Sequence, residues 1–192
     1  IDGERGYYSK AMSALQYGLK KKGVTQTASV KSPYIYAEDN WTDDMELAYA
    51  AINYMVTTNM GNANGWYLAQ AVDYAKKEKI TPWLGTDTAN HYQWYPFINV
   101  GHYEIIRQMK ERDQSPRAGY SKEFIRNFSK NKDSVTSFYK EGIDKVWSKA
   151  KQNAFYRGVP FIWCSNNLTT SFAIQCYWYR QLRGDKTFAV LE

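Results

Sequence analysis

The sequence predicts an all-α fold, and three observations support this class. Apolar residues recur at intervals of three and four along most of the chain, which is the spacing of amphipathic helices. Alternation with a period of two, the pattern of strands, is confined to short pieces such as 33–37 and 160–163. With 192 residues, of which 44% are hydrophobic and 23% charged, the chain is predicted to bury a core as a single domain spanning residues 1–192.

The first half of the chain contains three predicted helices. The first covers residues 8–20, and Gly23 is expected to close it. The second starts near residue 43, where Thr42 or Asp43 is available to cap the exposed amides. The third lies within residues 66–78. Their apolar faces are, in order, Tyr8, Ala11, Met12, Leu15 and Leu19; Met45, Ala48, Tyr49, Ile52, Met55 and Val56; and Leu68, Ala71, Val72 and Ala75.

The second half continues the helical spacing. One helix starts near residue 90, a long amphipathic helix covers 134–152, and a third starts at 168 and is apolar or aromatic on most faces. The last of these is expected to be enclosed on all sides. Charged residues 127–133 are predicted to be a solvated helix face or a loop, and Asp185 is expected to cap a further helix.

The order of these helices predicts two concentric rings. Helices that begin with acids or aromatic residues and are apolar on most faces start near 43, 90 and 168. They alternate with the more amphipathic helices at 8–20, 66–78 and 134–152. An inner ring and an outer ring of antiparallel hairpins would produce this alternation, and the inner helices would then all start at the same end.

Three junctions before the predicted inner helices concentrate aromatic and polar side chains: residues 38–44, 82–94 and 160–167. Flat rings stack on the C–H faces of sugars, while Asp, Asn and His exchange hydrogen bonds with hydroxyl groups. The candidate sugar-binding residues are Trp41, Trp83, His91, Tyr92, Trp94, Trp163, Asn166 and Asn167. Core packing of the rings remains an alternative, as does a purely dipole-stabilising role for Asp43 and Asp44.

Charge and cysteine content narrow the class of partner. The formal charge is +6, but Lys and Arg fall at helix ends and in 17–23 and 127–133, so a nucleic-acid partner is not expected. Cys164 and Cys176 lie twelve positions apart without a CxxC motif, which favours two buried thiols. No apolar run has the length of a membrane span, so membrane insertion is not expected either.

Several segments carry a resemblance to a known family. They are NWTDDMELAYAAINYM (40–55), YLAQAVDYAKKEKITPW (67–83), GTDTANHYQWYPFINVGHYEI (85–105) and GVPFIWCSNNLTTSFAIQCYWYRQLRGDKTF (158–188). In order and spacing they resemble the middle and later part of the catalytic domain of family 9 glycoside hydrolases, which are cellulase-type (α/α)6 barrels. The resemblance covers most of the chain from about Asp39 onward. It implies inverting hydrolysis of β-linked glucan or a related plant-type polysaccharide, by a secreted, periplasmic or cell-surface protein.

The resemblance also implies what this chain contributes. The family's catalytic aspartates and general-acid glutamate lie in motifs that are absent here, so we expect no catalytic residue in this chain. The chain is expected to be a fragment of the barrel that supplies substrate-binding wall, is inactive alone, and has an oligo- or polysaccharide and the rest of the catalytic domain as partners. The alternative is a self-contained helical carbohydrate-binding or protein-interaction module.

A structural calcium ion is a further expectation, although no cofactor is required. Some relatives hold calcium with carboxylates from the starts of two neighbouring inner helices, and the matching positions are Asp43, Asp44 and Asp87. Calcium takes six to eight oxygen ligands, so backbone carbonyls near Asp39 or Asn40 and water would complete its shell. Asp44 stands where those relatives often have Glu.

Overall fold

The computed structural model describes residues 2–24, 41–59, 65–78, 99–114, 122–161 and 165–192. These residues form six α-helices and two short 3₁₀ turns, and no strand occurs among them, which confirms the all-α class. The elements are α1 (Asp2–Lys20), α2 (Thr42–Asn59), α3 (Trp66–Glu78), α4 (Val100–Gln114), α5 (Lys122–Lys151), η3 (Ala154–Tyr156), α6 (Ser165–Arg183) and η4 (Ala189–Leu191).

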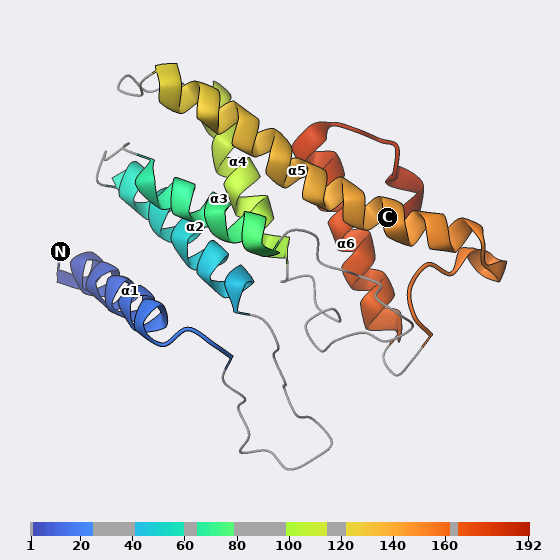
Figure 1. The fold of residues 1–192 in the computed structure, drawn as a ribbon, viewed down its shortest axis with the longest axis horizontal. Coiled ribbons are helices and arrows are strands. Elements are labelled where there is room, and N and C mark those ends of the chain that lie inside the picture. The colour runs from blue at the N-terminus through green and yellow to red at the C-terminus, as the bar shows by residue number, and fades with distance from the viewer. Residues whose placement is uncertain (1, 25–40, 60–64, 79–98, 115–121, 162–164) are drawn as a thin grey trace, which may run out of the picture.

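The helices are arranged in two layers. In the first layer α4 packs against α2 on one side and against α6 on the other. In the second layer α3 packs against α5, and both helices cover α4. Figure 1 shows α5 crossing in front of α4 and α6, while α1 lies at the opposite edge and packs on α2. The three helices predicted as inner, α2, α4 and α6, therefore lie in the first layer, and two of the three predicted as outer, α3 and α5, lie in the second, whereas α1 packs beside α2.

The three helices of the first layer run in the same direction. Two side-chain pairs follow one another in the same order along α2 and α4: Glu46 with His102, and Asn53 with Gln108. Two contacts also follow one another in the same order along α4 and α6: Asn99 with Gln175, and Lys110 with the backbone of Gln181. α2, α4 and α6 therefore all begin at the same end of the molecule.

The second layer runs in the opposite direction. The Thr42 hydroxyl donates to the Glu78 carboxylate at 2.5 Å, which places the start of α2 beside the end of α3. Arg183 at the end of α6 lies 3.5 Å from Asp133 in the first half of α5. Each of these neighbouring pairs is therefore antiparallel, as expected for helical hairpins.

One hydrophobic cluster runs through both layers, from Leu15 in α1 to Phe188 after α6. The predicted apolar faces of α2 and α3 are buried or partly buried, as the helical spacing predicted. In α1 only part of the predicted face is covered, because Ala11 and Leu19 are exposed while Leu15 is buried.

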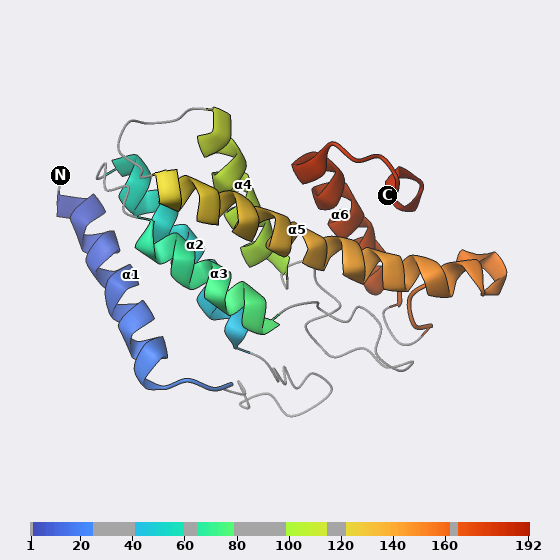
Figure 2. The same cartoon turned by 45° about the horizontal axis from the view of Figure 1, so that its top comes forward.

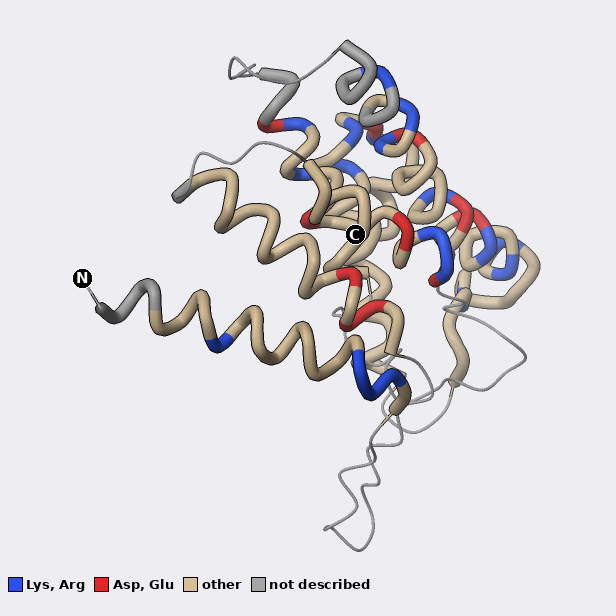
Figure 3. The backbone as a smooth tube through the Cα atoms, turned by 60° about the vertical axis from the view of Figure 1, so that its left-hand side comes forward, with Lys and Arg blue, Asp and Glu red and all other residues tan. Residues whose placement is uncertain are grey.

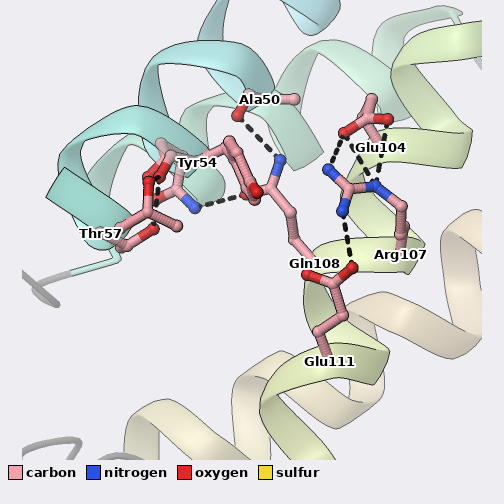
Figure 4. A network of polar contacts seen from close by, with 9 residues as sticks. Ala50, Tyr54, Thr57, Glu104, Arg107, Gln108 and Glu111 are labelled. Atoms are coloured by element: carbon pink, nitrogen blue, oxygen red, sulfur yellow. Dashed lines mark hydrogen bonds and ion pairs between the residues drawn. The ribbon is translucent and has the colours of Figure 1, made fainter.

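Polar side chains tie α2 to α4 inside this core. The Gln108 amide donates to the Ala50 carbonyl at 2.9 Å, and its oxygen accepts from Asn53 at 2.8 Å (Figure 4). Beside it, Arg107 lies between Glu104 and Glu111 and stacks over the Tyr54 ring at 4.9 Å. Paired groups of this kind satisfy their own hydrogen bonds and fix one register between the two helices.

Two sequence-based expectations about the helices were wrong. α5 begins at Lys122, twelve residues before the predicted start at 134, so residues 127–133 lie on this helix, which is one of the two alternatives predicted for them. α6 is not enclosed on all sides: its buried residues form one stripe, while Tyr177 on the other side is 45% exposed.

The capping expectations also require correction. α2 begins at Thr42, and the Trp41 carbonyl accepts the bond from the Met45 N–H, so Thr42 and Asp43 belong to the first turn rather than to the cap. Asp185 does not cap a long helix. Its carboxylate accepts from the N–H of Thr187 at 2.9 Å, which is an Asx turn ahead of the short η4.

Candidate functional site

Acidic side chains gather where α2 begins, α3 ends and α4 begins. We call Asp43, Asp44, Glu46 and Glu78 the acidic cluster. Figure 3 shows the acids at the start of α2 on the same side as the Lys-rich end of α1, and Gly18 of α1 lies close to Met45. The helices of the first layer all begin at this end of the molecule. The acidic cluster therefore lies at the end where the sequence predicted a site.

Asp43 is the most perturbed carboxyl of the cluster. Burial raises the pKa of Asp43 to about 7, and repulsion from Asp44 and Glu78 adds to the effect, while nearby backbone N–H groups oppose it. Its Oδ1 is buried and has no hydrogen-bond partner among the described residues. A carboxyl group in this setting binds a proton near neutral pH, and a cation placed against it would stabilise its charged form.

Glu46 is sealed inside the molecule against His102. Its carboxylate is 0% exposed, and Oε1 lies 2.6 Å from Nδ1 of His102. Burial raises the pKa of Glu46, and the neighbouring His102 opposes that rise. A Cβ at Gly101 would lie 2.8 Å from Cδ of Glu46, so glycine is needed for α4 to approach this carboxyl.

Further buried polar groups connect the start of α4 to α5 and α6. The Tyr139 hydroxyl of α5 donates to the backbone carbonyl of Asn99, and the Asn99 amide donates to Gln175 of α6 at 3.1 Å. His102 also contacts the rings of Phe138 and Tyr139. The start of α4 is therefore held by hydrogen bonds to both α5 and α6.

Trp41 leads a row of aromatic rings along α2 and α3. Its ring meets the edge of Tyr74 at 6.1 Å, Tyr74 stacks on Tyr49 at 5.7 Å, and Tyr49 contacts Trp66 at 6.0 Å. Trp41 is only partly buried, so one side of this predicted sugar-binding ring packs against the protein. Core packing, the alternative left open for the aromatic residues, thus accounts for part of its environment.

The remaining predicted site residues divide into two groups. Asn166 and Asn167 lie in the first turn of α6 with exposed side chains, and Asp44 is exposed beside Asp43. The others lie outside the described residues: Trp83, Asp87, His91, Tyr92, Trp94 and Trp163. Cys176 is a buried free thiol, as predicted, and burial raises its pKa to about 12, whereas Cys164 lies outside the described residues.

Three residues of the site were not singled out from sequence: Glu46, Glu78 and His102. His102 follows the apolar period of α4, and Glu46 lies one position from Met45 on the buried side of α2. The sequence signal was a polar residue at a position of an apolar helix face. Such a residue indicates a buried polar pair, because buried charged groups are normally paired. The sequence alone did not identify the partner of either residue.

The acidic cluster can bind protons, and the contact of Glu46 with His102 orients α4. The carboxylate oxygens of the cluster are also the type of ligand that hard cations prefer. Within the described ranges, no group of three or more His, Cys, Asp or Glu side chains is arranged to hold a metal ion. The third predicted calcium ligand, Asp87, falls outside those ranges. The fit of calcium therefore rests on Asp43, whose buried Oδ1 is the kind of oxygen that a cation would satisfy.

Comparisons of the chain with family models, curated proteins and solved structures found no match. In the part of the chain that the structure describes, no helix is both long and apolar enough to cross a membrane.

Proposed function

We propose that this chain is the substrate-binding part of the catalytic (α/α)6 barrel of a family 9 glycoside hydrolase. The observation that carries the proposal is the parallel direction of α2, α4 and α6 beneath an antiparallel second layer. Barrels of concentric helical hairpins require this arrangement, because all inner helices then start at one end and form the floor of a single cleft. The described helices would supply about half of such a barrel.

The polar residues at that end support a carbohydrate ligand. Asn166 and Asn167 expose amide groups in the first turn of α6, where they can donate to and accept from sugar hydroxyls. Trp41 lies at the start of α2 with part of its ring uncovered. Trp83, His91, Tyr92, Trp94 and Trp163 remain candidates for the same surface, and the ligand would be a β-linked glucan met outside the cytoplasm.

The carboxyl groups of the acidic cluster are unsuitable as the acid and base of the reaction. Inverting hydrolysis needs two carboxyl groups about 6.5–9.5 Å apart on opposite faces of the sugar. Glu46 is sealed against His102, and Asp43 and Asp44 are sequence neighbours whose side chains diverge around a helix. Catalysis would therefore depend on residues supplied by the rest of the catalytic domain.

A second candidate function is a self-contained helical module that binds carbohydrate or protein without catalysis. The observation that favours it is the continuous hydrophobic cluster, which reaches from Leu15 to Phe188 without a break between the layers. A module of this kind would unfold cooperatively and remain monomeric. A partial barrel would instead expose an apolar flank and associate.

Substitution of the exposed amides tests the proposed function. Asn166→Ala and Asn167→Ala together should weaken binding of soluble β-glucan by about tenfold, because each lost hydrogen bond costs roughly 0.5–1.5 kcal/mol. The matched control is Thr170→Ala in the next turn of α6, whose hydroxyl bonds only to the Asn166 carbonyl among the described contacts. Release of reducing sugar should be absent for every variant. Hydrolysis by this chain alone would contradict the assignment of acid and base to other residues.

A further inference from the structure

The segment after α5 exposes three aromatic rings. We call residues 153–161 the aromatic turn. Phe155 is 100% exposed, Phe161 is 78% exposed and Tyr156 is 70% exposed. Buried side chains of this size dominate cores and interfaces, so three such rings in contact with solvent on one short turn require an explanation.

The backbone of the aromatic turn is strained. Phe155 and Tyr156 have φ values of 62° and 51°, in the left-handed region that bulky side chains rarely adopt. Strain of this kind costs about 1–3 kcal/mol per residue and persists where the surroundings hold it in place. It occurs most often in segments that bind a ligand, because a fixed conformation of the segment serves binding.

Gly158 is one of the groups that hold the turn. A Cβ at this position would lie 2.7 Å from both Cγ1 and the carbonyl oxygen of Val146 and 3.1 Å from the Cβ of Ala150. The chain therefore folds back against α5 at a distance that glycine permits. Val159 then packs against the core, which anchors the far side of the turn. The rings at its tip are consequently presented on a rigid base.

Cationic side chains accompany the rings. Tyr156 stacks on Trp147 with centroids 6.2 Å apart and an interplanar angle of 19°. Lys151 lies 5.7 Å from the Trp147 ring, and Arg157 lies 6.0 Å from the Phe161 ring. Residues 145–161 contain four Lys or Arg and no Asp or Glu. The surface thus combines flat apolar faces with hydrogen-bond donors.

We propose that the aromatic turn is a binding site for the pyranose rings of a β-linked glucan chain, an inference that rests on the proposed function. Because α5 is antiparallel to α6, the end of α5 and the aromatic turn lie on the side of the molecule where α6 begins. Figure 2 shows the last turns of α5 extending beyond α6. The turn is also separated from the exposed Asn166 by only four residues of chain. A glucan lying across the start of α6 would therefore continue onto these rings.

The composition of the turn favours a sugar over a protein partner. The exposed large apolar side chains between residues 153 and 161 are all aromatic. Planar rings flanked by donors match the alternation of C–H faces and hydroxyl groups along a glucan. A protein interface also enriches aromatic residues and Arg, and it is the alternative outcome of the test.

The test measures binding of soluble β-glucan to the full 192-residue chain by isothermal titration calorimetry. Phe155→Ala and Tyr156→Ala should each raise the Kd by about tenfold, the loss of one ring that stacks on a sugar. Tyr156→Phe keeps the ring and should retain the affinity. The matched control is Tyr17→Ala, which removes a 63% exposed ring from α1 and should leave the Kd unchanged.

A stability measurement separates binding from folding. Phe155→Gly should raise the melting temperature, because glycine adopts a φ of 62° without strain, and it should weaken glucan binding as much as Phe155→Ala does. Loss of binding in a stabilised variant cannot come from misfolding.

Each other outcome would overturn a defined part of the account. If the unaltered chain does not bind β-glucan, the proposed function fails and this inference fails with it. If the unaltered chain binds and the Phe155 and Tyr156 variants bind equally well, the proposed function stands and the aromatic turn is not part of the site. If these variants abolish self-association in light scattering and leave the Kd unchanged, the turn is a contact between copies of the chain.

Discussion

At the scale of single residues, Asp43 makes the stability of the protein depend on pH. The folded-state pKa of Asp43 is about 7, well above its ordinary value of 3.8, so the folded state binds this proton more tightly than the unfolded state does. The stabilisation is complete below pH 3.8 and is lost as the pH rises through 7. In the wild-type protein, this residue therefore disfavours folding at alkaline pH.

Asp43→Asn removes the titration and should stabilise the chain at pH 8 by about 1–2 kcal/mol, after allowance for solvent screening. At pH 4 the two proteins should differ little, because Asp43 is then protonated when folded. Chemical denaturation in the presence of EDTA at the two pH values measures the difference. An equal effect of the substitution at both values would show that burial does not perturb this carboxyl.

Gly101 permits the contact between α4 and the buried Glu46. Gly101→Ala should destabilise the protein by about 2–3 kcal/mol, because the added Cβ would displace a carboxyl that is hydrogen-bonded to His102. Gly6→Ala in α1 is the matched control. A Cβ there meets nothing within 4 Å, so this change should stabilise by about 0.5–1 kcal/mol. Urea unfolding of both variants gives the comparison, and equal effects would contradict the close packing at Gly101.

At the scale of the elements, apolar periodicity predicted most helices because burial of one face is what stabilises them. The third helix is the clearest case, since Leu68, Ala71, Val72 and Ala75 are all buried. The first half of α5 was missed because residues 127–133 carry mainly charged and polar side chains. The exposure of one face of α6 was missed because composition does not reveal which neighbours cover a helix.

The candidate site was only partly predictable for a related reason. Trp41, Asp43 and Asp44 stood out because they are unusual residues at a helix start. Glu46 and His102 did not, since they are 56 positions apart in sequence and their pairing depends on how closely α2 and α4 pack. The energetic effect of a buried charged group depends on its partner, and tertiary structure determines which residue that partner is.

Calcium would link α2 to the segment that contains Asp87. If the ion binds there, calcium added to chelator-treated protein should raise the melting temperature, since a ligand bound only by the folded state stabilises it. Asp87→Asn should remove that rise, whereas Asp73→Asn on the exposed side of α3 should preserve it. A melting temperature that does not respond to calcium would exclude the proposed structural ion.

At the scale of the whole molecule, the described helices combine a shared core with one end at which α2, α4 and α6 all begin. The hydrophobic cluster joins α1 to the segment after α6, and the polar pairs fix α2, α4 and α6 in one direction. Asp43, Asp44 and Glu46 of the acidic cluster lie near the start of α2, and the exposed amides lie in the first turn of α6. The sequence motifs suggest the proposed ligand of this end, and the common direction of the three helices places their first turns on the same side of the molecule.

The central claim is that this surface binds β-linked glucan without cleaving it. The most direct measurement is calorimetric titration of the full chain with a β-1,4-linked glucose hexamer, alongside its α-1,4-linked counterpart. The account predicts saturable binding of the β-linked hexamer, much weaker binding of the α-linked one, and no shorter products afterwards. Absence of binding, or equal affinity for both hexamers, would contradict it.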